Sequence, residues 1–384
     1  MKTKSLFSLT IAMLALAACS ENEITEQNPE VNKPIGFDTY ASVQTRRYET
    51  DIEVIKNFDL GVMAYKTTGD YSTTGAKEEF MKNQKVTWDK TNSKWEYDPV
   101  KFWPAGTNEK ISFFAYAPHT YGGSTYNTTL TSADASNNPK VNLTLQTYQY
   151  YLHDLVVSNP DDATSGTMNM SSGTVNFKFT HPLTRVAMEA KTGTDISTNT
   201  NTKVFITGVS LIHNNILNSK GTLDMKTLKW ADNQTDYLAS PYILQAYSKK
   251  DPNCGCLNLT AADFAGYKDL SLDISAGGKN TTSLFIKETD KDYYLFLLPV
   301  DDATGTANAG DVKVKIAYDI VTKTGDGTTH SKSSVEKEVS LPAGVFKKGV
   351  AHKFTFIIGL NAISFEASVD SWDTTSGNKD INVQ

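Results

Sequence analysis

Cysteine and arginine are both scarce in this chain of 384 residues. The cysteines are Cys19, Cys254 and Cys256, and the arginines are Arg46, Arg47 and Arg185. Three cysteines cannot form the disulfide framework of a chain this long, so the fold has to rest on an apolar core. None of the six histidines lies four residues from another histidine or from a cysteine. Because a structural zinc ion needs four ligands at short spacings, we expect no metal site.

An excess of positive charge is also missing. The chain has 37 Lys and Arg against 43 Asp and Glu, a formal net charge of -6, and no block of basic residues. Nucleic acid is therefore not an expected partner, because binding it requires the phosphates to be neutralised.

Motifs that carry catalysis or bind cofactors are absent as well. The sequence has no nucleophile elbow, no glycine-rich phosphate loop and no dinucleotide fingerprint. Three acidic pairs, Asp161-Asp162, Asp290 with Asp292, and Asp301-Asp302, lack the full spacing of a calcium loop, and we interpret them as surface turns. The sequence thus indicates neither an enzyme nor a cofactor-binding protein.

Long hydrophobic runs are missing except at the N-terminus. Leu6 to Ala18 is an apolar run that follows Lys2 and Lys4 and is shorter than a bilayer span. It ends in Leu16-Ala17-Ala18-Cys19, which resembles the lipobox of bacterial lipoproteins, in which the cysteine thiol is acylated. We expect a lipoprotein signal over residues 1–18, palmitate-type lipidation of Cys19 and a polar tether over residues 19–34. The alternative is an ordinary cleaved signal peptide with an incidental cysteine.

The rest of the chain has the period-two alternation of β-strands. Apolar residues make up 39% and aromatic residues 10% of the chain, enough for a sizeable core. The expected strands lie at 35–43, 58–64, 86–88, 95–97, 111–115, 141–145, 175–179, 204–206, 209–211, 223–225, 228–230, 270–274, 293–300, 312–320, 354–358 and 363–369. One short stretch, Thr260 to Lys268, has a helical pattern. Many short strands with turn clusters predict an all-β fold of two β-sandwich domains, at 35–180 and 181–384.

Cys254-Gly255-Cys256 is a C-x-C in an expected loop. After export, these two thiols would meet an oxidising compartment. The pattern is compatible with a small-ring disulfide between Cys254 and Cys256 or with two free loop thiols.

Several motifs, taken in order, resemble the fimbrillin superfamily of Bacteroidetes, in its Mfa-like branch of type V pilus subunits. They are the lipobox ending at Cys19, the strand from Ile35 to Val43 before Arg46-Arg47, Phe102-Trp103-Pro104 with Ile111 to Pro118, Phe179 to Val186, Lys347 to Phe356, and Ile363 to Trp372. The resemblance covers nearly the whole chain. It implies two transthyretin-like β-sandwich domains and an adhesive structural role, and the acidic residues after Cys19 resemble a surface-export signal of the same bacteria.

The resemblance also implies an assembly mechanism. The first strand, with Ile35, Phe37, Ala41 and Val43 on one face and Thr39 completing the row, would be removed by a protease that cuts after Arg46 or Arg47. The strand's departure would leave a groove with unpaired backbone groups, which a strand from another fimbrial subunit would fill. The alternative is a charged exit from the strand that is never cleaved.

The C-terminal residues have few of the alternating apolar positions that such a donor strand needs. Asp373 to Gln384 contain Gly377 and two apolar residues, Ile381 and Val383. By the resemblance, we expect a tip or minor accessory subunit rather than a stalk or an anchor subunit. Asp373-Thr374-Thr375 resembles a short O-glycosylation site of secreted Bacteroidetes proteins.

The sequence is also compatible with a second function, the binding of glycans. Loop tyrosines could bind glycans in a monomeric surface lipoprotein, and the candidates are Tyr121, Tyr126, Tyr148, Tyr150 and Tyr151. We interpret these tyrosines as strand packing, Phe102-Trp103-Pro104 as core and turn packing, and His181 as a structural histidine at a domain junction.

Overall fold

The structure is a computed structural model. It describes residues 32–41, 55–73, 75, 77–106, 108–121, 124–125, 130–131, 138–145, 154–161, 166–193, 201–231, 236–246, 272–273, 282–284, 294–300, 312–323, 330–342, 345–359, 363–371 and 379–381. Every element with named bounds in these ranges is a β-strand, which confirms the all-β class. Among these residues, none forms a helix long and apolar enough to cross a lipid bilayer. The expected helical stretch Thr260 to Lys268 lies outside the described residues.

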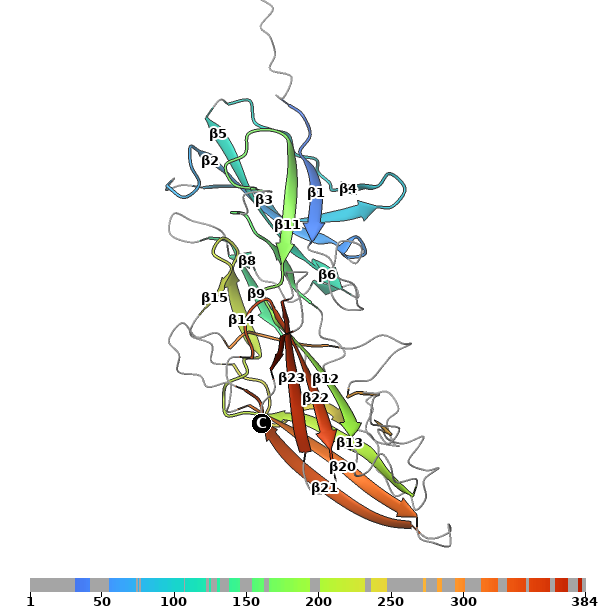
Figure 1. Cartoon of the computed structure of the whole chain (residues 1–384). Coiled ribbons are helices and arrows are strands. Elements are labelled where there is room, and N and C mark those ends of the chain that lie inside the picture. Colours follow the sequence, from blue (N-terminus) through green and yellow to red (C-terminus); the bar gives the residue numbers. More distant parts are fainter. Residues whose placement is uncertain are drawn as a thin grey trace, which may run out of the picture.

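The N-terminal half is built on a seven-stranded sheet, at the upper end of the molecule in Figure 1. Its strands, in spatial order, are β1 (Gly36–Ala41), β11 (Thr174–Thr180), β10 (Val156–Ser158), β5 (Glu109–Ala117), β2 (Leu60–Thr68), β3 (Glu78–Asp89) and β4 (Lys94–Glu96). The expected hairpin is confirmed, because Trp88 of β3 pairs with Trp95 of β4. Figure 1 shows this hairpin projecting from the side of the sheet.

The central strands of this sheet are buried on both faces. On β2, Val62 and Ala64 face a core shared with β1, β5 and β11, whereas Met63 and Tyr65 belong to a second core that continues into the C-terminal half. The same division holds on β5. A sheet with two apolar faces has to be covered on both sides, so the N-terminal half cannot be complete by itself.

A four-stranded sheet crosses the boundary that the sequence predicted near residue 180. It joins β8 (Leu130–Thr131) and β9 (Lys140–Thr144) to β14 (Lys220–Asp224) and β15 (Lys229–Trp230). β9 and β14 pair antiparallel, with Leu143 opposite Gly221 and Val141 opposite Leu223. The domain boundary predicted near residue 180 cuts through this sheet, because β9 pairs with β14 from beyond residue 181.

Two further sheets form the C-terminal half, at the lower end of Figure 1. One contains β18 (Thr282–Ser283), β12 (Thr184–Thr192), β22 (Val350–Ile358), β23 (Ile363–Ser371) and β24 (Lys379–Ile381), with β19 (Leu295–Leu297) also on β12. The other contains β16 (Tyr242–Ala246), β13 (Thr202–Ile212), β20 (Lys313–Lys323) and β21 (His330–Ser340), with β17 (Leu272–Asp273) also on β13. A small hairpin of β6 (Thr120–Tyr121) and β7 (Ser124–Thr125) follows β5.

The core of the C-terminal half follows the alternation in the sequence. Val314, Ile316 and Tyr318 of β20 are buried, whereas Lys315 and Ala317 between them are partly exposed, as the period-two pattern predicts. In the continuous apolar run at 293–300, residues 294–299 are all buried as expected, whereas Val300 is partly exposed and Tyr293 lies outside the described residues.

Candidate functional site: the first strand and its slot

β1 is the terminal strand of the seven-stranded sheet. It pairs in parallel with β11, in a register that runs from Gly36 opposite Thr174 to Ala41 opposite Phe179. Figure 1 shows the two strands side by side. A terminal strand has one edge in the backbone ladder and a second edge that other groups have to satisfy.

The side chains of β1 alternate strictly between the core and the surface. Ile35, Phe37 and Thr39 are 2%, 7% and 3% exposed, whereas Gly36 and Asp38 between them are exposed. The sequence predicted this row, and the structure confirms it for these three positions. Ala41 lies in β1, but its side chain is not among those described, and Val43 lies outside the described residues.

Phe37 sits in an aromatic enclosure. Its ring stacks on Phe177 of β11 at 5.5 Å between centroids and 18° between planes. Tyr97 and Phe113 approach from two other directions, with centroids at 5.1 Å and 6.1 Å. Offset-stacked and tilted ring pairs stabilise beyond the burial of their area. Phe37 therefore ties β1 to β11, β5 and the segment after β4 at once.

The second edge of β1 is held by the chain around residue 100. The Ile35 amide donates to the Lys101 carbonyl at 2.9 Å, and the Tyr97 hydroxyl donates to the Ile35 carbonyl at 2.8 Å. The N–H and C=O of one residue point to the same edge of a strand, so both Ile35 groups are satisfied away from β11. Burial raises the pKa of Tyr97 above its ordinary value, which keeps the hydroxyl protonated as a donor.

Thr39 is held by two further contacts, one to its core-facing side chain and one to its amide on the same edge. The Trp95 indole Nε1 donates to the Thr39 hydroxyl at 3.3 Å, and the contact is buried. The Thr39 amide donates to Oδ1 of Asp38 at 2.7 Å, so a side chain of β1 itself covers that position. Side chains thus satisfy the part of this edge that no neighbouring strand pairs with.

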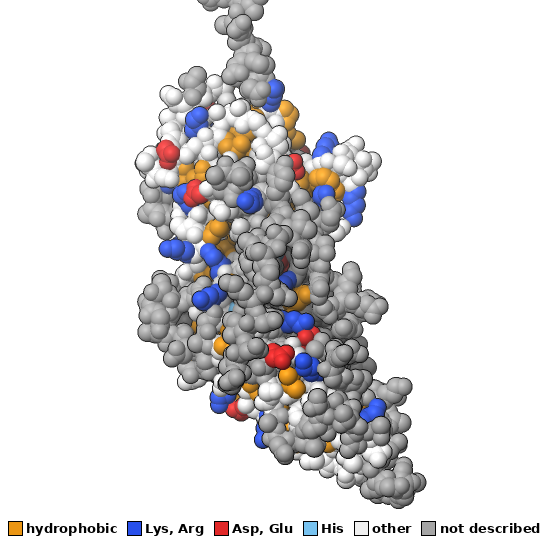
Figure 2. Space-filling model, viewed as in Figure 1, with side chains coloured by type: hydrophobic (Ala, Val, Ile, Leu, Met, Phe, Trp, Pro, Cys, Tyr) orange, Lys and Arg blue, Asp and Glu red, His pale blue; other side chains and the backbone are white. Residues whose placement is uncertain are grey.

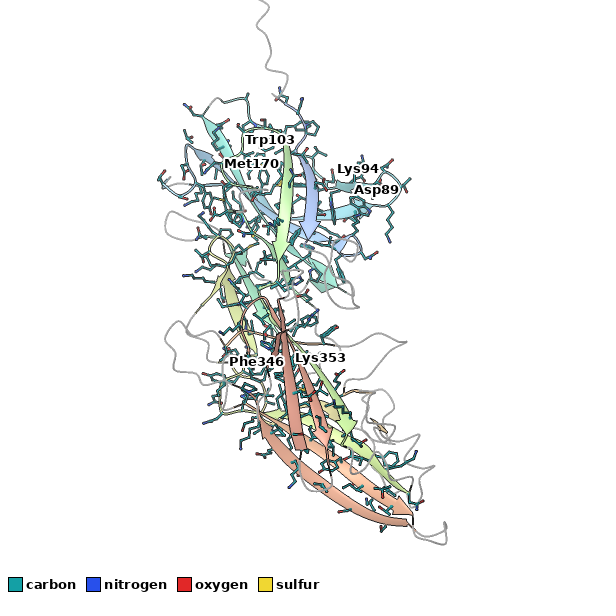
Figure 3. The ribbon with its side chains drawn as sticks, viewed as in Figure 1. Asp89, Lys94, Trp103, Met170, Phe346 and Lys353 are labelled. Carbon is teal, nitrogen blue, oxygen red and sulfur yellow. The ribbon has the colours of Figure 1, made fainter. Side chains whose placement is uncertain are left out.

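Two residues of the expected tether already belong to the fold. The Trp103 amide donates to the Lys33 carbonyl at 3.0 Å, and Pro34 forms an isolated bridge with Phe102. The Trp103 indole donates to the Gly173 carbonyl, at the turn into β11. Figure 3 labels Trp103 near the upper ends of β1 and β11. The tether predicted over 19–34 therefore ends earlier, before Lys33.

Comparison with known proteins agrees with this geometry. The sequence profile of the fimbrillin-like family matches residues 45–372. The chain belongs to the fimbrillin-like family. It is 37% identical over 395 residues to the fimbrium subunit Fim1C of Phocaeicola vulgatus, with all of both chains covered. It is also similar to the crystal structure of a fimbrial protein from Bacteroides vulgatus, with 32% identity, a TM-score of 0.71, and 89% of this chain and 100% of that chain covered. The resemblance inferred from the sequence is confirmed.

Several predicted site residues of this fimbrillin-like protein lie outside the described residues. They are Cys19, Arg46, Arg47, Cys254, Cys256 and Thr374 with Thr375. Of the candidate glycan-binding tyrosines, Tyr121 lies in β6 without a described side chain, and the other four lie outside the described ranges. Lipidation, cleavage, the disulfide and glycosylation therefore stay predictions.

Sequence reasoning missed the residues that hold the second edge of β1. Trp95 and Tyr97 were predicted only as a hairpin strand, and Lys101 was not singled out. The available signal was two aromatic residues with polar tips at positions 95 and 97, since buried Trp and Tyr usually need a hydrogen-bond partner. Trp103 is buried as predicted, but Phe102 is 49% exposed and does not pack in the core.

His181 of the fimbrillin-like protein lies in the link between β11 and β12. Its Nδ1 is 2.8 Å from Oδ2 of Asp154, and both side chains are buried. This placement agrees with the structural role predicted for it. Within the ranges that the structure describes, no group of three or more His, Cys, Asp or Glu side chains is placed to hold a metal ion.

The described side chains on the face shown in Figure 2 form no strongly charged area. On the side shown in Figure 2, acidic and basic side chains are interspersed, and hydrophobic side chains show only in small separate areas. The described ion pairs are mostly between exposed Lys and Glu or Asp, such as Lys94 with Glu96 at 2.8 Å. Such pairs contribute little to stability.

Proposed function

We propose that this protein is an adhesive structural subunit of a cell-surface fimbrium, and that it assembles by β-strand addition after losing its first strand. The observation that carries the proposal is the position of β1: it ends a sheet, it has one backbone ladder, and its inward side chains complete the core. Family membership and the names of the two relatives support the fimbrial setting. The proposal assigns no catalytic activity to the chain.

The proposed removal of β1 follows cleavage after Arg46 or Arg47. Loss of the strand would expose Phe177, Phe113 and Tyr97 together with the free edge of β11. Each hydrogen bond restored by an incoming strand contributes about 0.5–1.5 kcal/mol, and each large apolar side chain buried about 1.5–3 kcal/mol. Over a strand of this length these terms add up to a durable joint between subunits.

The precursor is proposed to reach the outer membrane as a lipoprotein anchored through Cys19. The support is the lipobox-like end of the apolar run, and an acylated cysteine with more than one chain gives stable anchoring. Metabolic labelling with a fatty acid tests this. The wild-type precursor should be labelled and Cys19→Ser should not, and equal labelling of both would refute lipidation at Cys19.

We also propose that this chain is a tip subunit or a minor accessory subunit of the filament. The support is the pairing of β24 with β23 of the same chain, where Ala367 lies opposite Ile381 and Val369 opposite Lys379. A C-terminal segment that pairs within its own sheet, and that carries few apolar residues, is a poor donor for another subunit.

Incorporation into filaments tests both parts of the proposal. Changing Arg46→Ala together with Arg47→Ala should abolish incorporation, whereas deletion of residues 374–384 should leave it nearly unchanged. Immunogold particles should lie at filament ends. Unimpaired incorporation of the arginine variant would refute the cleavage step, and labelling along the whole shaft would refute the terminal position.

A further inference from the structure

The slot of β1 is the space that this strand fills between β11 and the chain from Trp95 to Lys101. We propose that the slot selects an incoming strand by the chemistry of three alternate side chains of that strand. The sequence it selects is a large apolar residue, an aromatic residue two positions later, and a Ser or Thr two positions after that. The inference rests on the proposed replacement of β1, and it names the kind of strand that can replace it. The three positions are those of Ile35, Phe37 and Thr39.

The middle position selects an aromatic ring. The Phe37 ring is stacked on Phe177 and flanked by Tyr97 and Phe113, so planar surfaces surround it on several sides. Phe177 and Phe113 are fully buried, at 0% exposed each, and cannot move apart without disturbing β5 and β11. A small side chain would leave an empty space between rigid rings, and interiors relax only partly around such a loss.

The third position selects a hydroxyl group. The Trp95 indole is 6% exposed, and its N–H donates to the Thr39 hydroxyl. Trp88 packs edge-on against the same indole at 5.3 Å between centroids, which fixes the direction of the N–H. An aliphatic residue of the same shape, such as Val, would bury the indole N–H without an acceptor. The loss of a buried partner costs more than a hydrogen bond contributes.

The first position selects against proline while accepting a large apolar side chain. Both backbone groups of Ile35 form hydrogen bonds on the edge away from β11, the amide with the Lys101 carbonyl and the carbonyl with the Tyr97 hydroxyl. Proline has no amide hydrogen and would leave the Lys101 carbonyl without this donor. The Ile35 side chain is 2% exposed and lies in the N-terminal core.

The intervening positions provide a matched control. Gly36 and Asp38 are exposed, and a Cβ built on Gly36 has no atom within 4 Å. Substitution at Gly36 should therefore not affect entry. A peptide in which Gly36 and Phe37 exchange places keeps the composition and puts the ring on the wrong face.

The test uses the full chain with a recognition site for a sequence-specific protease inserted in place of residues 44–47. After cutting, the segment that contains β1 stays bound only by non-covalent contacts, and fluorescent peptides of residues 33–43 compete for the slot. The wild-type and Gly36→Ala peptides should enter with affinities within about threefold, because the open space at Gly36 tolerates a methyl group. Phe37→Ala should weaken entry on the order of 100-fold or more, and Thr39→Val about tenfold.

A protein variant separates selection by the indole from general packing. Trp95→Phe removes the N–H and keeps an aromatic ring, so the Thr39→Val and wild-type peptides should then bind equally well. Preserved discrimination in Trp95→Phe would contradict the role assigned to the indole.

The outcomes separate this inference from the proposed function. If the wild-type peptide fails to replace the cut strand, the slot accepts no strand, and both the proposed function and the selection are wrong. If the wild-type peptide enters, and the Phe37→Ala, Thr39→Val and exchanged peptides enter equally well, strand replacement stands and the selection is wrong.

Discussion

His352 is a buried histidine whose surroundings oppose a positive charge. It lies on the core face of β22 at 5% exposed, and neither ring nitrogen has a hydrogen-bond partner in the described part of the chain. Its ring is nearly parallel to Phe354, at 8° and 6.1 Å between centroids. Burial, with a smaller contribution from Lys347, lowers the pKa of His352 to about 4. The imidazole is therefore neutral in the folded protein at neutral pH.

This residue predicts an acid-sensitive stability. The folded state holds the pKa of His352 at about 4, below the ordinary value of 6.5. Below pH 6.5 His352 binds a proton in the unfolded chain but stays neutral in the folded protein. The free energy of unfolding therefore falls as the pH drops towards 4. Between pH 7 and 5 the loss from this one group is about 2 kcal/mol. Urea unfolding of wild type and His352→Phe at both pH values should show a loss smaller by that amount in the variant. Identical losses in both proteins would contradict this account of His352.

β1 is an element held by different forces on its two edges. On one edge a regular parallel ladder joins it to β11. On the other edge the Tyr97 hydroxyl, the Lys101 carbonyl and its own Asp38 make single contacts in place of a full second strand. Its buried side chains, which pack in the N-terminal core, therefore contribute much of what holds the strand in place.

Two phenylalanines, one buried and one half-exposed, test how much the buried side chains of β1 contribute to the free energy of unfolding. Phe37→Ala should lower the free energy of unfolding by about 3 kcal/mol, because it leaves a space between Phe177, Tyr97 and Phe113. Phe102→Ala removes the same atoms from a side chain that is 49% exposed and should change stability by less than about 0.5 kcal/mol. Urea denaturation of the uncut protein measures both. Similar effects of the two changes would show that the aromatic enclosure does not hold β1.

Most of the strands that the sequence predicted have an alternating apolar row, and the run at 293–300 is continuously apolar. β1, β20 and the hairpin of β3 and β4 are of the alternating kind, and the core faces of β1 and β20 follow the alternation. β12 was not predicted, because Met188, Glu189 and Lys191 favour helices, although Met188 is buried and Glu189 is not. β21 was missed because it is an exposed edge strand, rich in Ser, Lys and Glu, whose pairing with β20 is a tertiary property.

The partners of β1 could not be predicted for the same reason. Tyr97 and Lys101 lie more than 60 residues along the chain from Ile35, and one sequence contains no signal for such a distant pairing. The pairing of β9 with β14 across the expected boundary is a second case of this kind. Alternation fixes which residues face a core, but it does not say which strands share that core.

The whole molecule is elongated, and one buried cluster links its two halves. Figure 1 shows the N-terminal sheet at one end, the four-stranded sheet in the middle and the long strands β20 and β21 at the other end. Tyr65 and Phe114 of the N-terminal sheet belong to the same apolar cluster as Leu223 and Phe356. Polar contacts reinforce the junction, where the Trp230 indole donates to the Pro182 carbonyl at 2.7 Å. The two halves therefore support each other.

This continuity predicts a single cooperative unfolding transition. A fragment of residues 181–384 would lack β9, which leaves the edge of β14 unpaired and Leu223 without its neighbours. Calorimetry of the whole protein should show one transition, and the fragment should be much less stable than the corresponding half in the intact chain. Two separate transitions, one of them matched by the isolated fragment, would refute the shared core.

A close packing contact at the junction gives a sharper version of the same test. A Cβ added to Gly221 would come within 2.8 Å of the Trp230 ring and 2.9 Å of Leu298. Gly221→Ala should therefore destabilise the protein by about 1–3 kcal/mol, whereas Gly36→Ala, which meets nothing within 4 Å, should not. If both changes are equally mild in urea denaturation, the packing of β14 against β15 and Leu298 is looser than described.

The central claim is that β1 belongs to the precursor and leaves before assembly. The most direct measurement is the N-terminal residue of the protein in purified fimbriae, determined by mass spectrometry of the intact subunit. The account predicts that the chain begins at Arg47 or Tyr48, without β1 and without lipid. A chain that begins at an acylated Cys19 and still contains Ile35, Phe37 and Thr39 would contradict it.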